Sequence, residues 1–193
     1  MIERNKVSGV VLAGGRGRRM DGADKGLVML NGRPLVRYAI DALVPLVDEL
    51  FISANRNRLD YQGFGYPVID DGNDDFDGPL AGILAALQMT QAEYLLVVPC
   101  DSPLLTKVHL QRLLNVLDEQ NTIAVAFDGE RLHPVILALK TGIKDDLAAY
   151  LASGERKLQR WIERHAFIRV DFSDVAPAFT NINSAAELAA LEQ

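Results

Sequence analysis

The chain has 193 residues and a formal net charge of −6, and its composition is 49% apolar and 24% charged. These values are typical of a globular protein and lie far from those of disordered, collagen-like or membrane proteins. The net negative charge disfavours a nucleic-acid-binding protein, because phosphate contacts usually need a basic face. The amino-terminal stretch lacks the apolar core of a signal peptide, and Cys100 is the only cysteine. We therefore expect a cytoplasmic protein without disulfides.

Short apolar segments alternate with segments of helical periodicity along the chain. Strands are expected at residues 7–13, 49–54, 66–69, 94–98, 122–127, 134–139 and 167–172. Helices are expected at 33–44, 79–89, 107–119, 143–151 and 156–165, with a last helix beginning at Ser184. This alternation predicts one α/β domain over residues 1–193, with three αβα layers around a mostly parallel sheet. Asp128-Gly129 between two predicted strands indicates a hairpin, so we expect a mixed sheet.

A glycine-rich segment follows the first predicted strand, and residues 12–26 read LAGGRGRRMDGADKG. Glycines let backbone N–H groups approach phosphate oxygens, and four basic side chains against two aspartates give a local charge of +2. The segment is not a Walker A loop, which needs Gly-Lys-Ser/Thr, and Met20 stands where a dinucleotide fingerprint needs its third glycine. It predicts a polyphosphate ligand, and the alternative is a glycine turn with solvated arginines.

Asp101 follows the most apolar predicted strand, 94–98, across Pro99 and Cys100. Ligands of parallel sheets bind beyond the carboxyl ends of the strands, where a carboxylate can hold Mg²⁺ between nucleotide oxygens. A turn-capping aspartate is the alternative, because Asp-Ser-Pro is a common turn sequence. The acidic run at residues 70–77 indicates either a second metal site or a contact with the ribose or base, and the alternative is a solvated acidic turn. Cys100 has no evident histidine partner and is expected to be packed beside its strand.

The pattern Leu-Ala-Gly-Gly-x-x-x-Arg-Met, followed by Asp-Lys-Gly, resembles the signature of nucleotidyltransferases with a Rossmann-like α/β fold. The version with Asp-Lys-Gly is similar to the MobA family, the molybdenum cofactor guanylyltransferases. Further motifs occur in the order and spacing of that family, and these are GPLAG at 78–82, PCDSP at 99–103, His133-Pro134, GER at 154–156 and NIN at 181–183. The resemblance therefore covers essentially the whole chain.

The resemblance implies transfer of GMP from GTP to the terminal phosphate of molybdopterin, with Mg²⁺ as cofactor and pyrophosphate as the second product. The implied catalytic residues are Asp101, which would also bind the metal, Lys25 and Arg19. The implied nucleotide contacts, in the amino-terminal half, are Leu12, Ala13, Gly14, Gly15, Lys25, Ser53, Asp71 and Asp101. The implied acceptor contacts are Gly78, Gly82, Arg156, Asn181 and Asn183. In the carboxyl-terminal half, a turn leading to a Ser184 cap is the alternative for the two asparagines.

Two positions depart from the family pattern. Ser53 stands where the family often has an asparagine that contacts guanine, and Asp21 replaces the first glycine of Arg-Met-Gly-Gly. Ser53 leaves open how strongly GTP is selected over CTP. The negative charge of Asp21 would weaken phosphate binding slightly, and the alternative is that this side chain faces solvent. A cytidylyltransferase, a sugar-1-phosphate nucleotidyltransferase and a non-catalytic nucleotide-binding module are the alternative functions. The resemblance also implies contact with molybdoenzyme-maturation proteins, and we expect a monomer that binds neither nucleic acid nor membrane.

Overall fold

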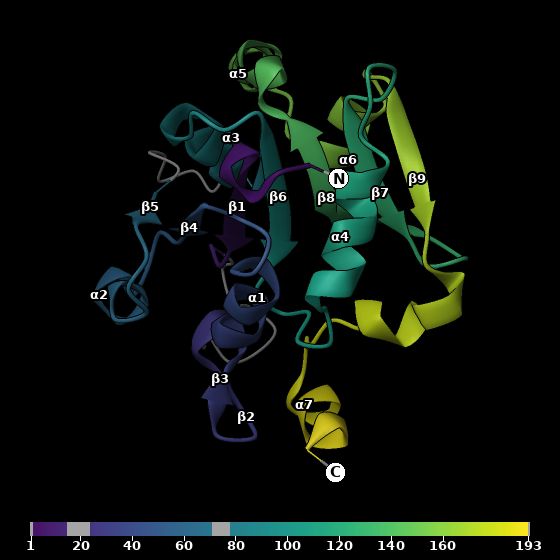
Figure 1. The fold of residues 1–193 in the computed structure, drawn as a ribbon. Helices are drawn as coiled ribbons and strands as arrows, with labels where there is room; N and C mark the ends of the chain where they lie inside the picture. The colour runs from purple at the N-terminus through teal and green to yellow at the C-terminus, as the bar shows by residue number, and fades with distance from the viewer. Residues whose placement is uncertain (1, 15–23, 71–77, 193) are drawn as a thin grey trace.

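The computed structural model describes residues 2–14, 24–70 and 78–192, and one large sheet runs through them (Figure 1). The strands of this sheet are β1 (Val7–Leu12), β4 (Glu49–Ser53), β5 (Val68–Ile69), β6 (Tyr94–Pro99), β7 (Ile123–Phe127), β8 (Leu132–Lys140) and β9 (Phe167–Asp171). Their order is β5-β4-β1-β6-β8-β7-β9. Only β8 runs antiparallel to its neighbours, β6 and β7. The expectation of a mostly parallel, mixed sheet is confirmed.

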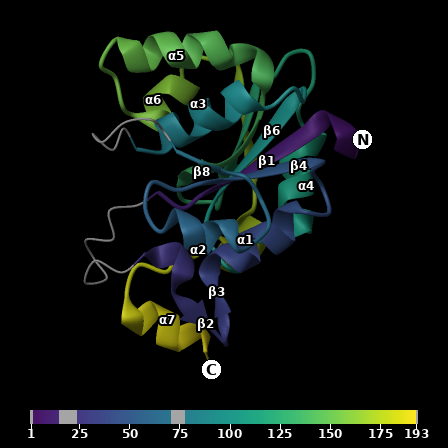
Figure 2. The same cartoon turned by 90° about the vertical axis from the view of Figure 1, so that its left-hand side faces the viewer.

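Helices cover both faces of this sheet (Figure 2). One face carries α1 (Leu35–Leu43) and α4 (Lys107–Asn115), and the other carries α3 (Pro79–Met89), α5 (Lys144–Ala152) and α6 (Leu158–Ile162). A hydrophobic cluster lies on each face of the sheet, because successive side chains of a strand point to opposite faces. Val98 of β6 packs in the cluster that includes Ile40 of α1. Its neighbour Val97 packs in the other cluster, with Trp161 of α6. The three-layer αβα architecture is therefore confirmed.

The helix predicted at 33–44 is α1, which begins at Leu35 and not at Arg33. Arg33 and Pro34 belong instead to a small hairpin. Strand β2 (Met29–Leu30) pairs antiparallel with β3 (Arg33–Pro34). Asn31 and Gly32 make the turn with φ angles of 49° and 73°, which the two central residues of a type I′ turn require. The Asn-Gly pair is visible in the sequence and could have predicted this hairpin.

The predicted helix at 107–119 is too long, because α4 ends at Asn115. The side chain of Asp118 accepts hydrogen bonds from the backbone N–H groups of Gln120 and Asn121, both at 2.9 Å, and so forms a turn instead. The hairpin at Asp128-Gly129 is confirmed, since β7 pairs with β8 across it.

The remaining elements are short and lie in the connections. They are η1 (Arg4–Lys6), η2 (Lys25–Leu27), α2 (Arg58–Gln62), η3 (Thr141–Ile143), η4 (Ser173–Phe179) and α7 (Ala185–Leu191). Ser184 caps α7 as predicted, because its hydroxyl accepts a hydrogen bond from the backbone N–H of Glu187. Within the residues described here, no helix is both long enough and apolar enough to cross a bilayer.

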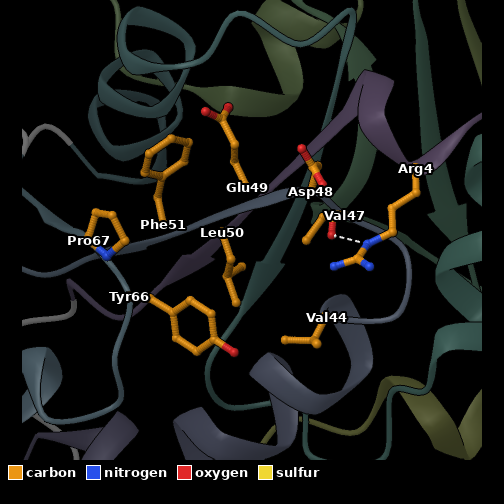
Figure 3. Close-up of a pocket in the computed structure, with 9 residues that line it drawn as sticks. All are labelled: Arg4, Val44, Val47, Asp48, Glu49, Leu50, Phe51, Tyr66 and Pro67. Atoms are coloured by element: carbon orange, nitrogen blue, oxygen red, sulfur yellow. Dashed lines mark hydrogen bonds between the residues drawn. The ribbon is translucent and has the colours of Figure 1, made fainter.

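A cavity of about 320 Å³ opens at the amino-terminal end of β4 (Figure 3). Leu50, Phe51 and Tyr66 contribute apolar walls, and Arg4 donates a 2.6 Å hydrogen bond from its Nε to the carbonyl of Val47 at the rim. Because ligands of such sheets bind beyond the carboxyl ends of strands, this cavity lies at the edge opposite the expected site.

Candidate active site

The carboxyl ends of three central strands lie side by side. Leu12, the last residue of β1, is paired with Ser53 of β4 on one side and with Pro99 of β6 on the other. The backbone N–H of Ala13 donates to the carbonyl of Ser53 at 2.8 Å, and that of Cys100 donates to the carbonyl of Leu12 at 3.1 Å. The predicted nucleotide contacts at Leu12, Ala13, Gly14 and Ser53 therefore share one edge with Asp101.

Lys25 lies between two oxygen-bearing side chains at this edge. Its Nζ is 3.1 Å from Oδ2 of Asp101 and 2.6 Å from Oδ1 of Asn183. The side chains of Lys25 and Asp101 are 21% and 16% exposed, so the ion pair is partly shielded from water but open to a ligand. A hydrogen bond thus links Lys25, which was predicted to contact the nucleotide, to Asn183, which was predicted to contact the acceptor.

The second carboxylate oxygen of Asp101 is left without a partner. Oδ1 is buried and has no hydrogen bond to any of the described residues. A buried carboxylate oxygen usually has a partner, so an orphan suggests a missing ligand or ion. A hard cation such as Mg²⁺ prefers oxygen ligands, and the residues present fit it. In the described parts of the chain, this edge included, His, Cys, Asp and Glu do not gather in groups of three, so Asp101 would hold the ion as a single protein carboxylate among phosphate oxygens.

The segment after η4 is docked onto the end of β6. The backbone N–H of Ile182 donates to the carbonyl of Asp101 at 2.8 Å, and Ser102 Oγ donates to Oδ1 of Asn181 at 2.8 Å. The side chain of Ile182 is fully buried in a small apolar cluster with Leu30 and Leu35. The two asparagines flank this buried side chain, and Asn181 contacts Ser102 after β6 while Asn183 contacts Lys25 of η2.

Glu187 of α7 holds the same segment from the other side. Its Oε2 accepts a 2.6 Å hydrogen bond from the backbone N–H of Asn183, and this bond holds the pKa of the carboxyl below its usual range. Glu187 therefore stays ionised at neutral pH and fixes the backbone of Asn183.

The other three predicted acceptor residues, Gly78, Gly82 and Arg156, lie on the face of the sheet that carries α3, α5 and α6, away from α7. Gly82 of α3 is buried, and a Cβ there would lie 2.5 Å from Ser53 Oγ and 3.0 Å from Leu12. Gly82 thus packs against predicted nucleotide contacts and not against the asparagines. Gly78 precedes α3 with a φ of 72°, and Arg156 is exposed on the loop from α5 to α6, where its Nη1 donates to the carbonyl of Leu151 at 2.8 Å. Figure 2 places this loop and α7 on opposite sides of the sheet at one edge.

Comparison with known proteins identifies the family. Residues 9–170 match the model of the MobA-like NTP transferase domain. The chain belongs to this family. A relative named molybdenum cofactor guanylyltransferase, from Shewanella sediminis, is 48% identical over 180 residues, which cover 93% of this chain and 92% of the relative. A protein of the same name from Shewanella loihica is 46% identical over 180 residues, with the same coverage of both chains.

Solved structures of MobA-like nucleotidyltransferases share the fold. One is the molybdopterin-guanine dinucleotide biosynthesis protein A from Archaeoglobus fulgidus, with a TM-score of 0.74 and 22% identity over 96% of both chains. Another is a nucleotidyl transferase from a Methanothermobacter species, with a TM-score of 0.77 and 22% identity over 97% of this chain and 96% of that one. Both similarities extend over nearly the whole chain, so these proteins share the overall fold described here.

Three predicted site residues of this MobA-like chain, Gly15, Arg19 and Asp71, lie outside the described residues. Cys100 lies beside the site but is buried, and burial raises the pKa of its thiol. A thiol that keeps its proton is a poor nucleophile, which agrees with the prediction that Cys100 is packed. The sequence reasoning passed over Ser102, although it stands inside the motif PCDSP and holds Asn181.

Proposed function

We propose that this protein transfers GMP from GTP to molybdopterin, forms molybdopterin guanine dinucleotide and releases pyrophosphate. The observation that carries the proposal is the position of Lys25 Nζ between Asp101 and Asn183, at the strand ends where a MobA-like enzyme binds its nucleotide. Relatives of 46–48% identity bear the name molybdenum cofactor guanylyltransferase, and their similarity supports the same activity here.

In the proposed reaction, an oxygen of the acceptor phosphate attacks the α-phosphorus of GTP, and the bond from that phosphorus to pyrophosphate breaks. Both groups are negatively charged, so the protein has to bring them together against their repulsion. The ammonium group of Lys25 offsets part of this charge, as do the basic residues of the glycine-rich segment. Catalysis then rests on positioning and electrostatic stabilisation and needs no covalent intermediate on the protein.

We propose Mg²⁺ as the cofactor and Asp101 as its protein ligand. When bound, the ion would neutralise phosphate charge and polarise the phosphate oxygens. Asp101 suits this role because Oδ1 has no partner among the described residues, while Oδ2 is held by Lys25. The side chain therefore has a defined orientation with one oxygen left for a cation.

We further propose that residues 1–193 form one domain that acts as a cytoplasmic monomer, with the nucleotide bound mainly by the amino-terminal half. The acceptor would lie along the same edge, reached from one face by Gly78 and Arg156 and from the other by Asn181 and Asn183. Proteins that mature molybdoenzymes are the proposed partners, because the product is a cofactor that has to be handed on.

The proposed function is tested by pyrophosphate release with each of GTP, CTP, ATP and UTP, in the presence and absence of molybdopterin. Release that needs both GTP and molybdopterin, with the dinucleotide seen by mass spectrometry, would support the proposal. Release with CTP, or with a sugar 1-phosphate as acceptor, would assign the chain to another nucleotidyltransferase. Tight GTP binding without any turnover would make it a nucleotide-binding module.

A further inference from the structure

Asp24, the residue before Lys25, is held by three hydrogen bonds although it is not among the predicted substrate contacts. Its Oδ1 accepts from the Tyr61 hydroxyl at 2.5 Å and from the backbone N–H of Gly26 at 3.3 Å. Its Oδ2 accepts from Nδ2 of Asn57 at 3.0 Å. These contacts tie the start of η2 to α2, which lies more than 30 positions further along the chain. The backbone at Lys25 is thereby fixed from its amino-terminal side.

Tyr61, which donates one of these hydrogen bonds to Asp24, is held rigidly in the core. Its side chain is fully buried in the core cluster that contains Ala13, Ala54 and Cys100, the residues that follow the ends of β1, β4 and β6. Burial, together with the bond to Asp24, raises the pKa of the phenol, so the hydroxyl keeps its proton and acts as a donor. A buried aromatic ring with its polar tip at the core boundary has little freedom to move.

Gly26, on the other side of Lys25, also rests on Tyr61. Gly26 is buried, and a Cβ at this position would overlap the Tyr61 hydroxyl and contact its ring carbons at 3.2 Å. Only a residue without a Cβ lets the backbone pass this close to the phenol. Both chain neighbours of Lys25 therefore contact one buried tyrosine, Asp24 by a hydrogen bond and Gly26 by close packing. The side chain of Lys25 itself bonds to Asp101 and Asn183.

We infer that Tyr61, acting through Asp24, is a positioning residue for Lys25. It holds the backbone at Lys25 in place before the nucleotide binds, so that binding does not have to order this segment. The inference rests on the proposed function, in which Lys25 binds GTP. The competing explanation is a structural tie that stabilises α2 and has no effect on Lys25.

A double-mutant cycle distinguishes the two explanations. Tyr61→Phe removes the hydroxyl and keeps the ring, and Lys25→Met removes the charge. GTP affinity and steady-state rates are measured for both single variants and for the double variant. We expect Tyr61→Phe to weaken GTP binding about tenfold in the wild-type background, the size of one hydrogen bond to a charged group. In the Lys25→Met background the same change should have no further effect.

Tyr150→Phe is the matched control, because Tyr150 is likewise buried and its hydroxyl donates a 3.1 Å hydrogen bond to the carbonyl of Lys157, away from Lys25. It should leave GTP affinity unchanged. Asp24 provides a second pair of variants at a half-buried position. Asp24→Asn keeps an acceptor for Tyr61 and should retain more GTP affinity than Asp24→Ala, which keeps none.

Each outcome decides between the explanations. Equal losses from Tyr61→Phe in both backgrounds, or a lower melting temperature with unchanged GTP affinity, would overturn the positioning role. Equal affinities of Asp24→Asn and Asp24→Ala would overturn it as well. Failure of the wild-type protein to turn over GTP with molybdopterin would instead overturn the proposed function, and the coupling of Tyr61 to Lys25 would still be read from GTP binding alone.

Discussion

Lys25 and Asn183 stand 158 positions apart in the chain, yet Nζ of the lysine donates a 2.6 Å hydrogen bond to Oδ1 of the asparagine. The bond links the glycine-rich segment after β1 to the segment before α7. It means that the group expected to hold the nucleotide is fixed in part by the half of the chain expected to hold the acceptor. Binding of the two substrates should therefore be coupled through this pair.

The coupling predicts that Asn183→Ala weakens GTP binding as well as molybdopterin binding. Lys25 loses one of its two acceptors, and a hydrogen bond to a charged group contributes about 1.5–3 kcal/mol. We expect a loss of GTP affinity of about tenfold, measured by titration with a fluorescent GTP analogue. Asn121→Ala removes an amide that donates to the nearby Asp118, far from the carboxyl ends of the strands, and is the control. A loss confined to molybdopterin would show that Asn183 serves the acceptor alone.

The sequence allowed the sheet to be predicted because β6 is a continuous apolar run, as a doubly covered strand needs, and β1, β4 and β7 are short and mostly apolar. It did not reveal α2 or η4, because each buries a single side chain, Tyr61 and Phe179, and one buried position shows no helical period. The contact of Lys25 with Asn183 was equally hidden. It depends on Ile182 being buried beside Leu30 and Leu35, and no local pattern encodes the meeting of such distant segments.

The close approach of Gly26 to Tyr61 predicts non-additive effects on stability. Gly26→Ala should cost about 1–3 kcal/mol, because the new methyl group meets the tyrosine hydroxyl. Tyr61→Phe should cost about 1 kcal/mol through the lost hydrogen bond. The double variant should be more stable than the sum predicts, since the phenylalanine has no hydroxyl to collide with. Urea unfolding of the four proteins measures the coupling.

Gly142→Ala supplies the control for this cycle, because a Cβ at Gly142 would meet no atom within 4 Å. Its effect should add to that of Tyr61→Phe within a few tenths of a kcal/mol. Strict additivity of Gly26→Ala with Tyr61→Phe would contradict the packing described for η2 on α2.

Asp128 predicts a pH dependence of stability. Its carboxylate accepts from the backbone N–H groups of Arg131 and Glu130 at 2.8 and 2.9 Å, and it contacts Nε2 of His133 at 2.7 Å. The hydrogen bonds from the Arg131 and Glu130 backbones, together with His133, hold the pKa of Asp128 well below its usual range. A depressed pKa stabilises the folded state above the pKa of the unfolded chain, near 4, and this contribution is lost as the pH falls.

Asp128→Asn should therefore be less stable than wild type at pH 7, by about 1–3 kcal/mol, and the difference should shrink between about pH 5 and pH 3. Urea unfolding across this pH range tests the prediction. Asp145→Asn, at an exposed position in the first turn of α5, is the control. Its free energy of unfolding should follow that of the wild type across the pH range with little difference. A difference for Asp128→Asn that stays constant with pH would show that the ionised carboxylate is not what stabilises the hairpin.

The metal ligand gives the sharpest prediction. Asp101→Asn keeps the shape of the side chain and can still form turn hydrogen bonds, but it removes the negative charge that a hard cation needs. Turnover should fall by about two orders of magnitude or more, on the scale of roughly 3 kcal/mol of lost electrostatic stabilisation. The Mg²⁺ requirement should shift to higher concentration. The melting temperature should change little, because the asparagine keeps an oxygen that can accept from Lys25 and Oδ1 has no partner to lose among the described residues.

The measurement is GTP- and molybdopterin-dependent pyrophosphate release against Mg²⁺ concentration, for wild type, Asp101→Asn and the exposed control Asp145→Asn. The control should reproduce the wild-type curve, since it removes a charge without touching the strand ends. If the turn role of Asp101 were its whole role, the Asp101→Asn enzyme would keep a near-normal rate and an unshifted Mg²⁺ curve. That result would remove Asp101 from the reaction and leave the acidic run at residues 70–77 as the remaining place to look for the metal ligand.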